Sequence, residues 1–345
     1  MHTLPTTVHN ESQLNDLLSE PTDAAVKAMR QLDGDVMLLG VGGKMGPTLA
    51  RMVQRASESS RAPRRVIGVS RFSSTEAQNS LTDCGVTTLQ GDLLDESFVR
   101  SLPDTPNVIF MTGMKFGASG NAARTWAMNV HVPTLVCRHL NGSRILAFST
   151  GNVYPLVPVN SGGCRETDPV GPIGEYAMTA LGRERMFEYF CQTLQIPTTI
   201  LRLNYAVELR YGVLVDIALQ VHREEPVDLS MGHVNVIWQR DANAMALAAL
   251  ADAEIGPYVV NCSGPEILRI REIAETFGRL FGKTPRFIGE EQPTALLNNG
   301  SLGHARYGKP TVPPETLMNW IATWIADGKP LLGKPTHFQT RDGRF

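Results

Sequence analysis

The sequence "DVMLLGVGGKMG", from Asp35 to Gly46, decides the fold of this chain. It begins with a continuous apolar run and ends in a series of glycines. A short apolar run without polar alternation is typical of a strand that is buried on both faces of a parallel sheet. The glycines follow the spacing G-x-x-G-x-x-G through Gly40, Gly43 and Gly46, whereas G-x-G-x-x-G fails because Met45 takes its last place. The stretch therefore predicts a strand, a tight turn and the start of a helix.

The residues after this turn predict a βαβ unit that binds a diphosphate. "PTLARMVQRA" (residues 47–56) has helical spacing, residues 57–64 form a predicted loop, and "RVIGVS" (65–70) is a second apolar run. The first glycine permits the tight turn, the second lets the backbone approach a pyrophosphate at the helix N-terminus, and the third permits close helix–sheet contact. A turn without a ligand is the alternative interpretation, but the strand–turn–helix context favours a dinucleotide.

The alternation of strands and helices continues to about Asn204 and predicts an α/β fold, a Rossmann-type doubly wound parallel sheet. Strands are expected at 86–90, 107–112, 144–150 and 198–204, and helices at 22–32, 123–140 and 175–194, with Pro133 marking a kink or a break. Helices at 212–223, 269–282 and 314–328 indicate a smaller second lobe. We expect an N-terminal extension (1–33), a dinucleotide-binding domain (34–204 and 234–263), and a substrate-binding lobe with a tail (205–233 and 264–345).

Composition excludes several classes of protein. Hydrophobic residues make up 42% of the 345 residues, charged residues 19%, and the net charge is −2, with no long basic stripe that would bind nucleic acid. No apolar run is long enough to cross a bilayer, and the N-terminus lacks the apolar core of a signal peptide. The five cysteines are scattered without a C-x-x-C pair, so neither a disulfide framework nor a metal site is expected. We expect a reduced, cytoplasmic protein that acts on a small-molecule substrate.

The end of the second predicted strand bears on the choice of dinucleotide. An NAD site usually has an acidic residue there for the ribose hydroxyls. Here "GVSRFSS" (68–74) contains no carboxylate, and Ser70 and Arg71 could hold a 2′-phosphate, with Lys44 adding charge. The alternative is that Arg71 is a solvated loop residue that stacks on adenine. NADP is therefore the favoured cofactor, and NAD is the alternative.

Segments along the chain resemble, in the right order, the extended short-chain dehydrogenase/reductase superfamily, the NAD(P)-dependent epimerase/dehydratase group. They are "GVGGKMG", "GDLLD", "STGNVYP", "YAMTALGRER", "RDANAMALAAL" and "YVVNCSGPE", and the resemblance covers roughly residues 34–290. It implies a Rossmann core, a small C-terminal substrate lobe and often a homodimer built on the helices after the fourth and fifth strands. It also implies that Asp92 bonds the adenine amino group. The implied cofactor-binding residues are Gly40, Gly43, Lys44, Met45, Gly46, Ser70, Arg71, Asp92, Leu93, Thr112 and Gly113.

The family's catalytic residues carry over unevenly. Thr150 matches the Ser/Thr that bonds the substrate oxygen and Tyr176 the proton-transfer Tyr, but Ala180 stands where the family has Lys. An unperturbed Tyr has a pKa of about 10, and the family's Lys stabilises its phenolate. The positively charged ring of an oxidised cofactor could stabilise the Tyr176 phenolate, but only when the enzyme works in the oxidising direction. Arg183 lies two helical turns after Tyr176, with marginal reach. Lys115, after the fourth strand, is the preferred catalytic candidate, and a solvent-facing loop lysine is the alternative.

Departures from the family pattern limit the substrate. Gly151 and Asn152 replace the acid/base pair of sugar 4,6-dehydratases, and "NYAVELRYG" (204–212) replaces a Gly-Pro-Arg stretch of nucleotide-sugar enzymes. One hypothesis is an NAD(P)-dependent oxidoreductase or epimerase acting on a sugar-like or other hydroxy/keto small molecule. The second is a catalytically silent NADP-binding regulatory or partner-binding protein. The tail from Lys334 could fold over the site, fold onto a neighbouring subunit, or fray.

Overall fold

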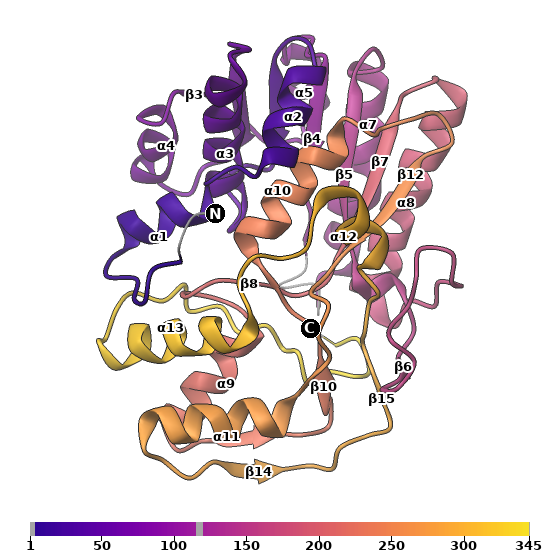
Figure 1. Ribbon diagram of the computed structural model, residues 1–345. Coiled ribbons are helices and arrows are strands. Elements are labelled where there is room, and N and C mark those ends of the chain that lie inside the picture. The colour runs from indigo at the N-terminus through magenta and orange to yellow at the C-terminus, as the bar shows by residue number, and fades with distance from the viewer. Residues whose placement is uncertain (1–3, 115–119, 345) are drawn as a thin grey trace.

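A seven-stranded parallel sheet forms the centre of the molecule, which confirms the predicted α/β Rossmann-type fold. Figure 1 shows the computed structural model, which describes residues 4–114 and 120–344. The strand order reverses between β1 and β4, and such a reversal opens a crevice at the carboxyl ends of the two strands. In spatial order the strands are β12 (Tyr258–Cys262), β7 (Thr198–Leu203), β5 (Arg144–Thr150), β4 (Asn107–Phe110), β1 (Val36–Leu39), β2 (Val66–Ser70) and β3 (Val86–Gln90).

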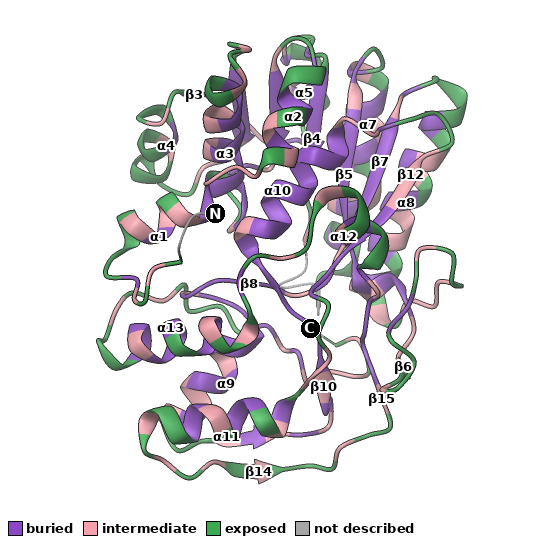
Figure 2. Cartoon of the chain, viewed as in Figure 1, coloured by how far each residue is buried: buried purple, intermediate pink, exposed green. Residues whose placement is uncertain are grey.

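Helices cover both faces of this sheet, which explains why its central strands are continuous apolar runs. All four residues of β1 are buried, and Figure 2 shows the central strands in the buried colour. Val36 and Leu38 pack on one face, and Met37 and Leu39 pack on the other. The first face is covered by α2 (Asp23–Gln31), α3 (Gly46–Ser60) and α10 (Gln239–Leu250), and the second by α5 (Glu96–Ser101), α7 (Val132–His139) and α8 (Gly174–Thr193).

The structure decides two local predictions about helices. Of the kink or break expected at Pro133, it excludes the break, because α6 (Ala122–Trp126) continues through a π-helical turn, Ala127–His131, directly into α7. Pro133 lies in the first turn of α7, where a missing N–H costs little. Residues 57–60 are the last turn of α3 rather than a loop, and Arg61 ends that helix in the left-handed conformation with φ 56°.

The C-terminal lobe has a hydrophobic core of its own, below the sheet in Figure 1. It is built on α9 (Val213–His222), α11 (Ile270–Phe281) and α13 (Pro314–Ala326), the three helices predicted there. Ile270, Ile273, Ala274 and Phe277 of α11 follow helical spacing and are all buried. The lobe also contains the parallel strand pair β9 (Pro226–Asp228) and β14 (Arg286–Ile288).

The N-terminal extension joins the two parts of the molecule. The predicted helix α2 packs on α3 and α10, and Thr22 caps it by accepting a hydrogen bond from the Ala25 N–H. A further helix, α1 (Glu11–Leu18), was not predicted, because only Leu14 and Leu18 of its eight residues are buried. Both leucines belong to the core of the C-terminal lobe.

The remaining α-helices and strands are short. They are α4 (Thr75–Thr82), α12 (Ser301–Tyr307), β6 (Val157–Pro158), β8 (Ala206–Val207), β10 (His233–Val234), β11 (Ile237–Trp238), β13 (Leu268–Arg269) and β15 (Thr294–Ala295). In the part of the chain that the structure describes, no helix combines the length and the apolar character needed to span a membrane. The residue boundaries predicted for the domains stay a prediction.

Candidate active site

A cavity of about 830 Å³ opens at the carboxyl ends of the sheet strands, between the sheet and the C-terminal lobe. Its wall combines segments far apart in the sequence: the glycine loop, the ends of β2, β4 and β5, one face of α8, the segment after β7, and the C-terminal tail. A crevice at this edge is where α/β sheets of this type bind their ligands. Of the predicted site residues that the structure describes, all but Gly46, which begins α3, line this cavity, namely Gly40, Gly43, Lys44, Met45, Ser70, Arg71, Asp92, Leu93, Thr112, Gly113, Thr150 and Tyr176.

The glycine loop contains two kinds of glycine. A Cβ on Gly40, which has φ 92°, would lie 2.7 Å from the Thr112 hydroxyl, and a Cβ on Gly46 would lie 2.1 Å from the Val41 carbonyl oxygen. The fold itself requires these two glycines. A Cβ on Gly43 would meet only the Gly40 carbonyl oxygen, at an ordinary 3.5 Å, yet Gly43 lines the cavity. Its missing side chain therefore leaves room for a ligand rather than for the protein.

The start of α3 faces this space without a capping side chain. Met45 occupies the N-cap position and makes no side-chain cap hydrogen bond. The first N–H groups of a helix have no partner within the helix, and they carry a partial positive charge. An open glycine cradle before an uncapped helix N-terminus fits the diphosphate of a dinucleotide.

A second group of cavity residues lies at the ends of β2 and β3 and consists of Ser70, Arg71 and Asp92. Arg71 is largely exposed, and its Nη1 lies 3.8 Å from Asp92 Oδ2, so this ion pair is weak. Asp92 also accepts a hydrogen bond from the Leu94 N–H at 3.0 Å. The guanidinium of Arg71 is thus available to an anionic ligand at the mouth of the cavity.

Lys44 extends toward the C-terminal lobe. Its Nζ lies 3.2 Å from the centre of the Tyr211 ring, in a cation–π contact. Glu208 and Asp216 of the lobe are close enough to Lys44 for its charge to lower their pKa values, which burial raises. The structure therefore places this ammonium group at the Tyr211 ring of the lobe. The expectation that Lys44 could add charge to a 2′-phosphate site stays a prediction.

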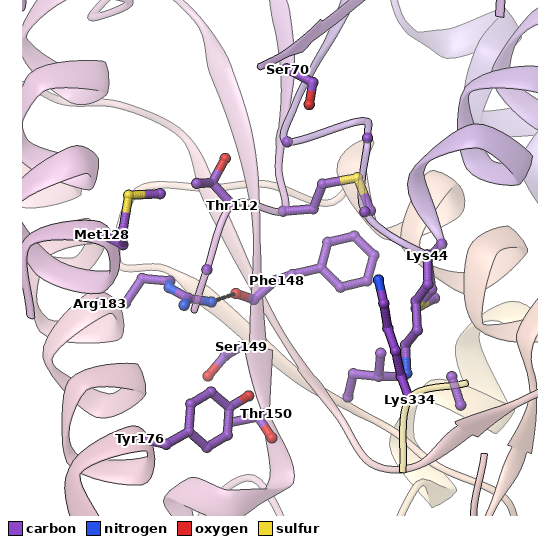
Figure 3. A pocket seen from close by; sticks show the side chains of 18 of the residues that line it. Lys44, Ser70, Thr112, Met128, Phe148, Ser149, Thr150, Tyr176, Arg183 and Lys334 are labelled. Atoms are coloured by element: carbon purple, nitrogen blue, oxygen red, sulfur yellow. Dashed lines mark hydrogen bonds between the residues drawn. The ribbon is translucent and has the colours of Figure 1, made fainter. Parts of the chain in front are cut away.

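Thr150 and Tyr176 meet in the same cavity. Thr150 ends β5 and Tyr176 stands in the first turn of α8, and Figure 3 shows their side chains next to each other. The two side chains are hydrogen-bonded to each other. The Thr150 hydroxyl also accepts hydrogen bonds from the backbone N–H of Asn152 at 3.2 Å and from its Nδ2 at 3.0 Å. Two hydroxyl groups thus lie side by side, as a reaction at a carbonyl or a secondary alcohol requires.

A buried ion pair joins β7 to α8, and Ser149 links β5 to the same carboxylate. Arg202 donates from Nε and Nη2 to the Glu184 carboxylate, at 3.0 and 2.7 Å, and both side chains are almost completely buried. The Ser149 hydroxyl donates to the same carboxylate at 2.5 Å. Because Ser149 precedes Thr150, and Glu184 lies two turns after Tyr176, this network holds the two hydroxyl-bearing side chains in register. Arg202 is therefore structural, and it does not line the cavity.

Ala180 is completely buried in a small cluster with Val153, Tyr154 and Cys164. The ammonium group of a lysine at this position would have to leave a mostly apolar environment before it reached Tyr176. Another cation of the same helix, Arg183, is 6% exposed and lines the cavity. The preferred candidate, Lys115, lies outside the described residues, so its role stays a prediction.

Arg183 is held by two neutral acceptors. Its Nη1 donates to the Phe148 carbonyl oxygen at 2.8 Å, as Figure 3 shows, and its Nη2 donates to Asn129 Oδ1 at 2.7 Å. Its Nε has no hydrogen-bond partner among the residues that the structure describes. Burial lowers the pKa of the guanidinium, and the neighbouring Tyr176 and Glu184 raise it.

Two further tyrosines were missed by the sequence analysis. Tyr205 and Tyr211 line the cavity on the lobe side, and burial raises the pKa of both. Both are close enough to Tyr176 for a phenolate there to raise their pKa values further. The departure "NYAVELRYG" marked this segment as unusual, but only the tertiary structure brings its two tyrosines to the cavity.

The C-terminal tail folds over the site, which was the first of the three alternatives considered for it. Lys334 and Thr336 line the cavity. Thr336 donates from its backbone N–H and its hydroxyl to Asp216 Oδ2, at 2.7 and 2.6 Å. Farther along, Arg341 donates to the Thr294 carbonyl oxygen at 2.8 Å, and Phe338 is buried in the core of the lobe.

Comparisons with known proteins agree with this geometry. Solved structures with the same fold include Pal from Bacillus thuringiensis (17% identity, TM-score 0.71, covering 86% of this chain and 100% of that one). A UDP-glucuronic acid 4-epimerase from Bacillus cereus in complex with NAD (17% identity, TM-score 0.69) covers 85% and 99%, respectively. A UDP-glucose 4-epimerase from Thermotoga maritima (16% identity, TM-score 0.70) also covers 85% and 99%. A search of curated protein sequences finds no match.

The model of the NAD dependent epimerase/dehydratase family matches residues 36–208, which is half of the chain and includes the glycine loop, Thr150 and Tyr176. The chain therefore belongs to the NAD dependent epimerase/dehydratase family and is an NAD(P)-dependent enzyme of the extended short-chain dehydrogenase/reductase type.

Proposed function

We propose that this enzyme is an oxidoreductase or epimerase that acts on a sugar-like or other hydroxy/keto small molecule. The observation that carries this proposal is the hydrogen-bonded pair of Thr150 and Tyr176 in the cavity that the open glycine cradle also lines. Proton transfer by a positioned side chain next to a second hydrogen-bonding group is the chemistry that interconverts a carbonyl and an alcohol.

The residues of the cavity fit a nicotinamide dinucleotide. The loop from Gly40 to Gly46 would hold its diphosphate, Asp92 and Leu93 its adenine, and Thr112 and Gly113 would line the path toward Tyr176. Bound there, the dinucleotide would supply a two-electron carrier that accepts or returns a hydride. Because Ser70 and Arg71 stand where an NAD site usually has a carboxylate, we propose NADP as the preferred form.

The hydroxyl groups of Thr150 and Tyr176 would have different roles at the substrate oxygen. Thr150 would donate a hydrogen bond to the substrate oxygen, and Tyr176 would exchange a proton with that oxygen. In reduction, the carbonyl carbon gains a hydride and its oxygen takes the Tyr176 proton; in oxidation, both leave in the reverse sense. Burial raises the pKa of Tyr176, which keeps the phenol protonated near neutral pH and favours its role as proton donor.

Tyr205, Tyr211 and the tail limit the size of the substrate. The two epimerases named above act on UDP-sugars, but here the lobe side of the cavity is occupied by these tyrosines and by Lys334. A cavity of about 830 Å³ must hold both the dinucleotide and the substrate. Pockets of 300–1,000 Å³ are typical for one drug-sized ligand. We therefore favour a small substrate without a nucleotide.

A catalytically silent NADP-binding regulator is the second candidate, because Ala180 replaces the catalytic lysine of the family. Two features favour the enzyme instead. The cavity beside Thr150 and Tyr176 is open rather than filled by side chains, and a second cation, Arg183, lines it. Absorbance assays of nicotinamide turnover with sugars, sugar acids and keto acids test the choice. The regulator would be favoured if the protein binds the dinucleotide but turns over no compound of this panel, and if Tyr176→Phe does not change that result.

The first prediction concerns the choice of dinucleotide. In Arg71→Ala, the Kd for NADP should rise about 10- to 100-fold, the effect of losing a hydrogen bond to a charged group, while the Kd for NAD stays nearly unchanged. Calorimetric titration of the purified protein with each dinucleotide measures both constants. Arg65→Ala is the matched control, because Arg65 is also an exposed arginine flanking β2 but pairs with Asp35. Equal weakening of NADP and NAD in Arg71→Ala would instead indicate stacking on the adenine.

The second prediction concerns assembly. We propose a homodimer through the face formed by α6 and α8, where Trp126 and Met178 are 42% and 40% exposed. Sedimentation equilibrium should give twice the 37.7 kDa of the chain. Met178→Glu should sediment as a monomer, since a carboxylate cannot be buried unpaired at such an interface. Leu280→Glu, on the exposed side of α11, is the control that should stay dimeric. A monomeric unaltered protein would rule out this assembly.

A further inference from the structure

We infer that Arg183 supplies to Tyr176 the positive charge that a lysine four residues after the tyrosine supplies in the family. The inference rests on the proposed role of Tyr176 in proton transfer. It names the group that makes a phenolate possible at this site although Ala180 cannot. Arg183 acts through Tyr176, so it is a positioning residue of the reaction.

The geometry of α8 brings the guanidinium back toward Tyr176. Seven residues of helix rise about 10.5 Å, which is too far for a short side chain. Long side chains in helices lean toward the N-terminus, over the preceding turn, so an arginine at this spacing can reach back. Figure 3 shows Arg183 and Tyr176 on the same side of the cavity, with the guanidinium bonded to the Phe148 carbonyl oxygen.

The charge of Arg183 is not neutralised by a carboxylate. Among the residues that the structure describes, no acidic side chain lies within ion-pair distance of it, and its two hydrogen-bond acceptors are neutral. Its neighbour Glu184 is engaged by Arg202. An unpaired buried cation is costly and is typical of sites where an anion binds or forms. The phenolate of Tyr176 is an anion that would form there during the reaction.

The surroundings are shaped around this arrangement. Gly113 packs against the guanidinium, because a Cβ there would lie 2.4 Å from Arg183 Nη2. Asn129 accepts from Arg183 and also from the Met114 N–H at 2.9 Å, so it fixes the guanidinium to the segment after β4. Ala180, by contrast, packs in a mostly apolar cluster and contributes no charge to the site.

Among the residues that the structure describes, the titratable groups whose charge is coupled to that of Tyr176 include Arg183 from its own helix and Tyr205 and Tyr211 from the segment after β7. Burial is the largest influence on Tyr176 and raises its pKa, whereas Arg183 and the Thr150 hydroxyl lower it. Loss of the cation therefore removes a stabiliser of the phenolate. The sign follows directly: without Arg183, Tyr176 loses its proton at higher pH.

The third prediction tests this coupling without substrate. A fluorinated tyrosine, which is more acidic than tyrosine, is placed at position 176, so that its phenolate absorbance can be titrated below the pH of alkaline unfolding. With Arg183→Gln, the titration midpoint should rise by about 1 pH unit, the low end of the effect of a nearby opposite charge. Arg183→Lys keeps the charge on a shorter side chain and should restore part of the difference.

Three further variants make the assignment falsifiable. Gly113→Ala displaces the guanidinium without removing it and should raise the midpoint by a smaller amount, which also covers the case that Arg183→Gln fails to fold. Arg185→Gln, an exposed pair with Glu188 on the same helix, should leave the midpoint unchanged. Lys115→Gln tests the other candidate. An unchanged midpoint in Arg183→Gln and Gly113→Ala, or a change in Lys115→Gln alone, would overturn the inference.

Turnover then separates this inference from the proposed function. With an identified substrate and an unmodified Tyr176, the alkaline limb of the pH–rate profile should move to higher pH in Arg183→Gln, whereas a merely structural role would lower the rate at every pH alike. A shifted phenol midpoint in a protein that turns over no substrate would leave the electrostatic coupling intact and reject the enzymatic proposal. An unshifted phenol midpoint in a protein that turns over substrate would reject the electrostatic coupling and leave the enzymatic proposal intact.

Discussion

Tyr176→Phe should turn over substrate about 10²- to 10⁴-fold more slowly than the unaltered protein, the usual contribution of a positioned acid or base. The change removes one oxygen atom, the one that is hydrogen-bonded to Thr150 in the cavity. Dinucleotide affinity should change little, because the glycine loop and the residues around Arg71 are untouched. Single-turnover absorbance of the nicotinamide measures the reaction step, and calorimetry measures the binding.

Tyr189→Phe is the matched control for this variant. Tyr189 lies on the same helix, α8, but it is 56% exposed and does not line the cavity. Its loss of a hydroxyl should leave the turnover rate unchanged. A Tyr176→Phe protein that keeps the full rate while Thr150→Val loses it would reassign the proton transfer to another group and contradict the mechanism proposed here.

Glu184→Gln should lower the free energy of unfolding by about 3–5 kcal/mol, the usual cost of leaving a buried charge without its partner. The carboxylate accepts two hydrogen bonds from Arg202 and one from Ser149, and all three residues are buried. Urea denaturation followed by circular dichroism measures the loss. It is a large part of the 5–15 kcal/mol that stabilises a typical domain.

Glu188→Gln provides the comparison on the same helix. Glu188 also pairs with an arginine, Arg185, at 2.6 Å, but the arginine side chain is half exposed. An exposed pair contributes about 0–1 kcal/mol, because water and salt screen it. Equal destabilisation of the two variants would show that the hydrogen bonds of Glu184 to Arg202 and Ser149 do not stabilise the packing of α8 on β5 and β7. We also expect Glu184→Gln to lower turnover, since Thr150 follows directly after Ser149.

The fold could be predicted from the sequence because its signals are local. A strand covered on both faces must be apolar throughout, so "DVMLLG", "RVIGVS" and "RILAFST" were recognisable without any partner. The glycine spacing was equally informative, since Gly40 is required by the positive φ of the turn and Gly46 by the nearby Val41 carbonyl within the loop. The helix α1 was missed for the converse reason: two buried leucines in eight residues do not make a clear apolar stripe.

The candidate site could be predicted only in part. The dinucleotide cradle and the pair of Thr150 and Tyr176 follow from short motifs. The missing cation does not, because position 183 shows only that an arginine lies on the right face of a helix. Whether its side chain leans into the cavity depends on the room left by Gly113 and on acceptors from β5 and the π-helical turn.

The sequence by itself thus determined the Rossmann sheet and the glycine cradle, because each depends on neighbours in the chain or on a period of the backbone. The two catalytic candidates, Thr150 and Tyr176, came from the resemblance of their motifs to those of the family. The tertiary structure decided the rest: that Ala180 is committed to packing, that Arg183 faces the cavity, and that Tyr205, Tyr211 and the tail close its lobe side. These features depend on distances between segments far apart in the chain. Such distances exist only once the sheet and the lobe have packed together.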